Sequence, residues 1–502
     1  MNDVYMDGVR AVRASMFFER ALLPILLLLF SLSPEPLAAQ GFRGEVGMSA
    51  SFLETPTLVR DSVPESEVPG EGRLRQLPDG TVVTCTTGEF CRWYRSGPIE
   101  PIWVLNQDLR LAIWTGVQGL SLHTALRGRY GTDGFWPRSS QEFDALSAYV
   151  RYNHKNFQAK GGRLYLTNGL GFYNFDGASF LWRGFSPLRV KVWGGWGLAP
   201  NIDQRVDGSL MQAADVLAPD DGSYVLGAEI GANWGRVLSG NVMYQRVIRT
   251  DRLALYSERA AFDLRALLGP VIVDAAAKYD FAYDEVNLGL LRVSTPIAGG
   301  FSLSAEARHY TPYFELWTIW GAFSPVGFNE GNGSVLWSSP KAGLTLQAGG
   351  GYRDYEETNS GADFVPMKED GWRVFGRASW ASRGWYADGG YRAETGFGAV
   401  RYGGDVAFGR AFSSGTYLGL RGSSTQTFSE FRIGEQFLAG GGIDGALAIA
   451  GFSLRGSYAI YRVDYDNDPA RTDWTQNRAN IGLYYAFGTT TTARSYRAGG
   501  DQ

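Results

Sequence analysis

The sequence is poor in the residues from which metal and catalytic sites are usually built. It holds two cysteines and three histidines among 502 residues, which leaves little material for a metal site. Its net charge of −4 excludes the basic footprint of a nucleic-acid-binding protein. Long apolar runs are missing as well: beyond residue 40 the longest, 445–452, covers about eight residues, whereas a membrane-spanning helix needs about 20.

Glycine and aromatic residues are abundant instead. The chain has 66 glycines and 14% aromatic residues, while charged residues reach only 20%. The plentiful aromatic and branched apolar residues exclude a disordered chain, and glycine without a three-residue period excludes collagen. The composition therefore favours an all-β protein.

The N-terminus predicts export. Residues 21–32 form a short apolar segment that follows several arginines and precedes the turn-prone stretch SPEPLAAQ. This order is typical of a secretory signal peptide, and we expect it to span residues 1–39 and to be removed near Ala39. A membrane anchor, the alternative, would need a longer apolar run. Export favours a disulfide between Cys85 and Cys91, because oxidising compartments preserve such bonds.

After residue 100 the chain repeats a period-two alternation of apolar and polar residues, interrupted by turns of Gly, Asp, Asn, Ser or Pro. One apolar and one charged face at period two is typical of a half-exposed β-strand. In 256–268 the apolar face holds Ala260, Phe262, Leu264, Ala266 and Leu268, and the charged face holds Arg259, Asp263 and Arg265.

Two architectures share this pattern: a soluble β-sandwich or propeller, and a transmembrane barrel whose apolar face meets lipid. The repeats are as long as the roughly 9–11 residues that a barrel strand needs, whereas soluble strands average about 5–6. Trp372 and Trp380 share one face about 26 Å apart along a strand, or roughly 20 Å apart in depth at a barrel's tilt. That separation suits two aromatic girdles, so we expect a transmembrane antiparallel up-and-down β-barrel.

The strand number follows from the connections. Bacterial barrels have short turns at one end, longer loops at the other and an even number of strands. Long connections at 54–103, 131–141, 168–176, 199–222, 251–255, 355–369 and 464–474 all fall at one end if there are 22 strands, with 20 and 24 left open. This count requires 299–323 to be one long strand with a kink at Pro312.

The same count predicts the organisation of the chain. We expect a first strand at 40–53, a barrel over 104–487 and a polar tail over 488–502. The segment 54–103, which contains both cysteines, is either a long outer loop or an inward-folded plug.

The last strand resembles the assembly signal of bacterial outer-membrane barrels: polar, any, Gly, any, any, aromatic or apolar, any, aromatic. Asn480, Gly482, Tyr485 and Phe487 occupy the defined positions of that pattern. The resemblance implies recognition by the barrel-assembly machinery and a place in the outer membrane of a Gram-negative cell, among membrane lipid and lipopolysaccharide. The stretch 162–182 also resembles early strands of alginate-export-type porins, which implies a porin-like barrel.

Alternation places a surplus of basic residues in the lumen. Rings of Arg or Lys favour the passage of anions, although charges that pair across strands would instead hold the wall. The predicted pore-lining residues are Arg127, Arg129, Arg151, Arg163, Arg259, Asp263, Arg265, Asp274, Lys278, Asp280, Glu306, Arg308, Arg373, Arg377, Asp388, Arg392, Arg401 and Asp405.

The sequence favours a channel over an enzyme. None of His123, His154 and His309 has an acid at a spacing that implies a catalytic dyad, and we expect no cofactor and no metal site. A passive channel for small anionic or polyhydroxylated solutes is the first hypothesis. A barrel that is closed to solutes and acts in adhesion, surface scaffolding or partner anchoring is the second. The residues do not predict an oligomeric state.

Overall fold

The computed structural model describes residues 41–85, 89–131, 143–198, 223–249, 255–311, 327–356, 370–396, 400–413, 415–428, 435–466 and 472–489. The predicted signal peptide and most of the C-terminal tail lie outside them. The elements are β1 (Gly41–Pro64), η1 (Glu65–Glu67), β2 (Leu74–Gln76), β3 (Val82–Cys85), β4 (Phe90–Trp114), β5 (Leu120–Gly131), β6 (Phe143–Asn153), β7 (Phe157–Asn168), β8 (Gly171–Phe185), β9 (Leu188–Gly197), β10 (Ser223–Trp234), β11 (Leu238–Arg249), β12 (Leu255–Leu268), β13 (Val271–Asp280), β14 (Glu285–Pro296), η4 (Ala298–Gly300), β15 (Phe301–Tyr310), β16 (Phe328–Ser339), β17 (Leu344–Tyr355), β18 (Asp370–Ser382), β19 (Trp385–Glu394), β20 (Val400–Ser413), β21 (Thr416–Phe428), β22 (Glu435–Ile449), β23 (Phe452–Asp466) and β24 (Trp474–Gly488).

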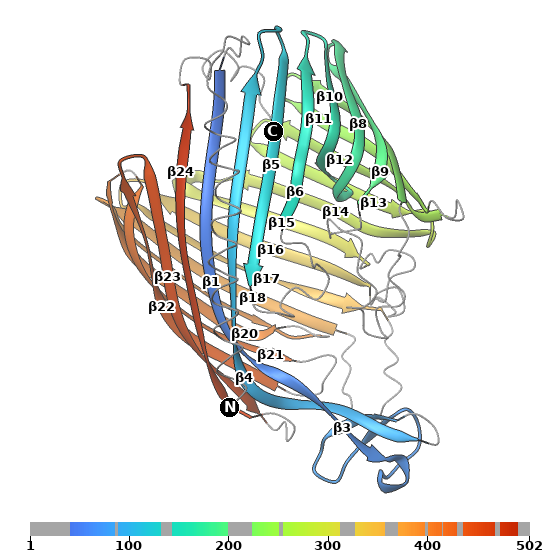
Figure 1. Ribbon diagram of the computed structural model, residues 1–502, viewed down its shortest axis with the longest axis vertical. Helices are drawn as coiled ribbons and strands as arrows, with labels where there is room; N and C mark the ends of the chain where they lie inside the picture. Colours follow the sequence, from blue (N-terminus) through green and yellow to red (C-terminus); the bar gives the residue numbers. More distant parts are fainter. Residues whose placement is uncertain are drawn as a thin grey trace, which may run out of the picture.

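The long strands form one closed barrel (Figure 1). From β4 to β24 each strand pairs antiparallel with the next in sequence. The first strand, β1, closes the ring because it pairs with β4 on one side and with β24 on the other, from Arg43↔Gly488 to Leu53↔Arg478. Among the described residues β1 and β4–β24 make 22 barrel strands, which confirms the predicted all-β barrel and its strand number.

The two ends of the barrel differ. We call the end where β1 begins and β24 ends the inner rim; its connections are short, such as Ala450–Gly451 between β22 and β23. The opposite, outer end carries the longer connections. The prediction of a long connection at 168–176 was wrong, because β7 and β8 are joined by only two residues. The strand predicted at 299–323 is described only as Phe301–Tyr310, and Pro312 lies outside the described residues.

The apolar face of the strands points outward. Trp372 and Trp380 of β18 are 47% and 37% exposed, and Val406 in the middle of β20 is 62% exposed. Their direct neighbours across the strands, such as Tyr352 and Gly389, belong to the same outward face. The two tryptophans therefore share one outward face, as the alternation predicts.

Aromatic rings gather at both ends of the outward face. At the inner rim Phe452 and Tyr485 stack with centroids 4.5 Å apart, and Phe487 lies next to Tyr485 at 6.1 Å. Near the outer end Trp196 meets Tyr224 edge-on at 5.2 Å. Two such girdles around an apolar band are typical of outer-membrane barrels, where the rings sit at the level of the headgroups.

The architecture meets the demands of a bilayer. Lipid cannot hydrogen-bond to backbone groups, and a closed ring of strands leaves none of them unpaired at an edge. No helix among the described residues is long and apolar enough to cross a membrane. With an even strand number, an apolar outer wall and aromatic girdles, the chain has the architecture of outer-membrane β-barrels.

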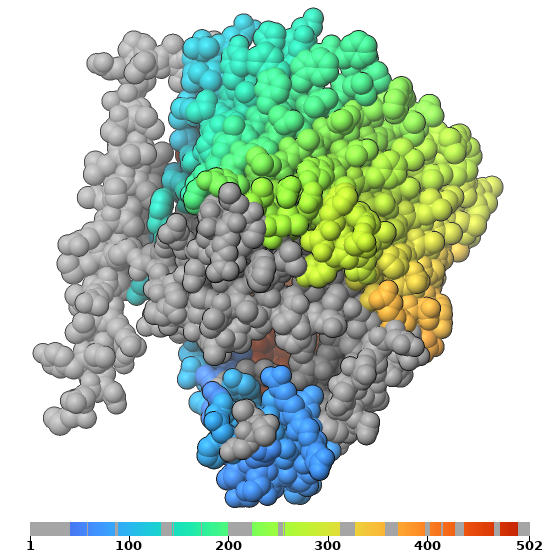
Figure 2. Space-filling model, turned by 90° about the vertical axis from the view of Figure 1, so that its right-hand side faces the viewer, coloured from blue at the N-terminus to red at the C-terminus, as the bar shows by residue number. Residues whose placement is uncertain are grey.

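Two strands continue far beyond the wall. The pairing of β1 with β24 ends at Leu53 and that of β4 with β5 at Val104, yet β1 and β4 stay paired as far as Pro64↔Phe90. They form a two-stranded arm that leaves the outer end of the barrel (Figure 1). In the space-filling view its tip is the blue lobe below the green and yellow strands of the wall (Figure 2). The described residues of 54–103 make up this arm and the lobe at its tip.

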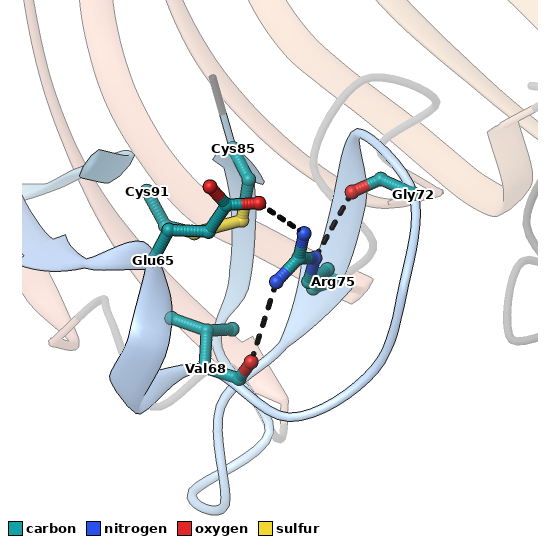
Figure 3. Close-up of a disulfide and its surroundings, with 6 residues drawn as sticks. All are labelled: Glu65, Val68, Gly72, Arg75, Cys85 and Cys91. Carbon is teal, nitrogen blue, oxygen red and sulfur yellow. Dashed lines mark hydrogen bonds and ion pairs between the residues drawn. A yellow bond between two sulfur atoms is a disulfide. The ribbon is translucent and has the colours of Figure 1, made fainter. Parts of the chain in front are cut away.

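The tip of the arm has a small core of its own. Cys85 and Cys91 form a disulfide that joins β3 to β4, and Val68 and Val83 pack beside it. Arg75 donates hydrogen bonds to the carbonyl oxygens of Gly72 and Val68 and forms an ion pair with Glu65 (Figure 3). So small a lobe buries little apolar surface, and the disulfide compensates by restricting its unfolded chain.

A charge placed on the outward face should destabilise the barrel. We expect Val406→Arg to lower the free energy of unfolding by about 2–4 kcal/mol, because the guanidinium would enter the hydrocarbon midplane. The control is Ser423→Arg, since Ser423 lies opposite Asp405 on the luminal face. Reversible guanidinium titration in phospholipid vesicles measures both variants. Equal losses of stability would show that the wall does not face lipid.

Candidate functional site: the lumen

The luminal face is defined by the strand register. Because opposite residues in a ladder share a face, the residues between the outward positions line the lumen. This places most of the predicted pore-lining residues there: Arg127, Arg129, Arg151, Arg259, Asp263, Arg265, Asp274, Lys278, Asp280, Glu306, Arg308, Arg373, Arg377, Asp388, Arg392 and Asp405.

For two of the predicted residues the register does not give a luminal side chain. Arg163 lies on the outward face, opposite Ala148 and Asp176, so its assignment to the lumen was wrong. It lies in the middle of β7, and its partner Asp176 pairs with Trp196 of the outer aromatic girdle. Arg163 donates two hydrogen bonds to the Asp176 carboxylate at 2.8 and 2.9 Å, which compensate its charge near the headgroups. Arg401 belongs to β20, but its side chain lies outside the described part of the structure.

A charged cluster lies at the outer end of the lumen, and the sequence predicted only its member Arg373 as pore-lining. Its centre is Glu330 of β16, whose side chain is fully buried. The Nε of Arg353 lies 3.3 Å from Glu330 Oε2, and Nη2 of Arg373 lies 2.7 Å from Oε1. Arg353 also pairs with Glu394 on β19. One glutamate therefore ties three neighbouring strands, β16 to β18, at the mouth of the barrel.

Other luminal arginines pair across strands in the same way. The Nε of Arg127 lies 2.6 Å from Asp108, and that of Arg421 lies 3.3 Å from Asp444. Such pairs cancel their own charge and hold neighbouring strands. Further pairs are Arg189–Glu229, Arg265–Asp274, Arg292–Glu306 and Arg377–Asp388.

Several luminal arginines stack on aromatic rings. The guanidinium of Arg455 lies 5.3 Å from the ring centroid of Tyr484, and that of Arg478 lies 4.7 Å from Tyr461. A cation–π contact leaves the positive charge in place, unlike a carboxylate. Among the described residues, Arg455, Arg478 and Arg392 are exposed and form no ion pair, so they present net positive charge to the lumen.

The β7–β8 hairpin narrows the lumen on one side. Leu170, in the two-residue turn, is 3% exposed and packs against Met243 of β11 and Ala261 of β12. Met243 and Ala261 lie opposite each other between the outward residues Val242 and Phe262, so they belong to the luminal face. The tip of this hairpin therefore lies inside the barrel, against the wall.

A seam of glycines allows the hairpin to bend inward. Gly162, Gly177 and Gly195 are direct neighbours across β7, β8 and β9 on the luminal face. A Cβ on Gly177 would lie 2.6 Å from the Cα of Gly195, so no side chain fits between these strands. Above the seam an apolar cluster covers the inner wall: Leu164, Leu166, Phe175, Trp193, Val225 and Val247.

Two histidines contact neutral groups. His123 lies 3.0 Å from the Ser121 hydroxyl and stacks on Tyr149, and His309 bonds to Asn329 and to a backbone carbonyl. Within the described residues no three His, Cys, Asp or Glu side chains gather in a way that could hold a metal ion.

The predicted assembly signal lies on β24, the strand that closes the ring. Asn480 and Gly482 belong to its luminal face, whereas Tyr485 and Phe487 face outward at the inner rim. Its recognition by the assembly machinery stays a prediction.

No protein-family model matches the chain, and no curated protein matches its sequence. Solved structures resemble it in fold. A BenF-like porin from Pseudomonas fluorescens Pf-5 shares 10% identity with a TM-score of 0.41, over 89% of this chain and 99% of that one. OpdQ of Pseudomonas aeruginosa shares 12% (TM-score 0.38; 89% and 98%), and the ferric citrate transporter FecA shares 10% (TM-score 0.46; 90% and 79%).

Releasing the hairpin tip should widen the lumen. We expect Leu170→Ser to destabilise the packing of the tip against the wall by about 2–5 kcal/mol, because the buried apolar contacts of the leucine are lost. The tip then leaves Met243, and the single-channel conductance in planar bilayers increases. The control is Val237→Ser in an inner turn, where Val237 is 57% exposed. An unchanged conductance in Leu170→Ser would show that the tip does not limit the pore.

Proposed function

We propose that this protein is a passive outer-membrane channel for small anionic solutes, including polyhydroxylated acids. The observation that carries the proposal is a group of exposed luminal arginines for which the described residues show no ion pair, among them Arg392, Arg455 and Arg478. Positive charge in a narrow water-filled pore favours anions, because the low-dielectric wall strengthens its effect on ions that pass.

The dimensions of the barrel support the same function. Barrels of 16–18 strands leave an aqueous channel, and a ring of 22 strands is wider still unless it is plugged. We infer that 54–103 supplies no plug, and the arm formed by β1 and β4, which leaves the barrel at its outer end, supports this. The inward β7–β8 hairpin narrows the lumen, but it covers only one side of the wall.

The alternative is a barrel closed to solutes that acts in adhesion, scaffolding or anchoring. The outer arm with its disulfide-bonded lobe favours it, because a rigid projection suits contact with a partner. The two functions differ in whether solutes pass through the lumen.

Reversal potentials in a KCl gradient test the selectivity. We expect chloride preference in the wild type, and a permeability ratio closer to unity when Arg392, Arg455 and Arg478 are all changed to Gln. The control removes three arginines of the outer arm and lobe, by Arg60→Gln, Arg73→Gln and Arg92→Gln. A cation preference in the wild type would contradict an anion channel.

Liposome swelling tests the solute class. Gluconate, sorbitol and glucosamine are similar in size but carry negative, zero and positive charge. We expect gluconate to enter fastest and glucosamine slowest, because the lumen repels cations. Liposomes that admit none of the three would favour the closed barrel.

A further inference from the structure

The inner rim is basic. Lys155, Arg183, Arg236, Lys341 and Arg383 all lie in or beside its described connections and are exposed, and these connections contain no Asp or Glu. The outer connections and the lobe carry the acids instead, for example Glu65, Glu67, Glu71, Asp79, Glu89, Asp284 and Asp473. Such an asymmetry brings positive charge to the headgroups of the inner leaflet.

An apolar groove lies on the outward wall from β15 to β20. It has a volume of about 680 Å³. Its floor consists of residues with little or no side chain, Gly376, Ala378 and Gly389, and larger side chains stand around it, among them Trp337, Leu346 and Tyr391. A methylene group is similar in size to water, which takes about 30 Å³, so the groove has room for an acyl chain.

The groove reaches the basic rim. Trp337 lies two residues before the end of β16, and the connection that follows, 340–343, contains Lys341. Arg383 lies in the connection between β18 and β19. These two connections are two strand spacings apart, or roughly 10 Å, so both cations lie at the inner end of the groove.

We propose that the groove and these two cations bind an anionic phospholipid of the inner leaflet. One acyl chain would lie along the small residues of β17–β19, and the phosphate would lie between Lys341 and Arg383. The proposal does not depend on what passes through the lumen.

Charge favours a lipid over a second copy of the chain as the occupant. Copies in one membrane insert in the same orientation, so a symmetric contact across the groove would bring their Lys341 and Arg383 side chains together. Like charges at that distance repel, whereas an anionic headgroup neutralises both.

Native mass spectrometry of the full chain tests the site. The barrel is held in micelles that contain equal amounts of palmitoyl-oleoyl phosphatidylglycerol and phosphatidylcholine. We expect the wild type to retain phosphatidylglycerol. Lys341→Ala with Arg383→Ala should lower its retention roughly 25-fold, because each of the two cations near an anionic headgroup is worth roughly fivefold. Gly376→Leu should lower the retention of both lipids, because its side chain fills the groove.

Matched controls separate the site from general effects. Gly456→Leu also adds a side chain to the outward wall, and the space at both glycines is similar, with the nearest atom 4.0 Å from a Cβ at Gly376 and 3.8 Å at Gly456. Lys155→Ala with Arg236→Ala removes two inner-rim charges elsewhere. Both controls should retain lipid as the wild type does. Equal losses of lipid in controls and test variants would overturn the proposal. A Gly376→Leu variant that keeps its lipid but no longer forms an oligomer seen in the wild type would also overturn it.

Discussion

The hydrogen-bonding of the backbone is the constraint from which the rest of this structure follows. In hydrocarbon an unpaired amide or carbonyl costs several kcal/mol, so a sheet survives there only when its edges meet. Here the meeting of β1 with β24 closes the ring. Closure fixes one face of every strand toward lipid and the other toward the lumen. The outward tryptophans, the aromatic girdles and the luminal arginines are consequences of that division.

The charges of the lumen serve two purposes. Pairs such as Arg127–Asp108 and the cluster around Glu330 join neighbouring strands and cancel their own fields. Arginines that stack on Tyr461 and Tyr484 are positioned equally well but keep their charge. Some arginines therefore stabilise the wall by pairing with carboxylates, while Arg455 and Arg478 stack on rings and keep their positive charge. The β7–β8 hairpin adds an apolar surface to another part of the wall.

Period-two alternation predicted the barrel and the facing of most luminal residues, because one apolar face dictates register over a whole strand. The parity of long and short connections predicted its 22 strands. Alternation failed where a polar residue faces outward. Arg163 alternates like a luminal residue, and only its pairing with Asp176, at the level of the outer aromatic girdle, indicates that it lies in the headgroup zone. Glu330 escaped because its neighbours Gly331 and Gly333 provide no apolar face. The inward hairpin depends on Gly162, Gly177 and Gly195, which are adjacent across strands but distant in sequence.

The most direct measurement is a spin-label scan along β18, with a nitroxide at each position from 373 to 380. If hydrocarbon meets the apolar face, collisions with oxygen peak at the even positions and collisions with a water-soluble nickel complex peak at the odd ones. If the nickel complex reaches the even positions as readily as the odd ones, that face is in water and the chain is not a membrane barrel.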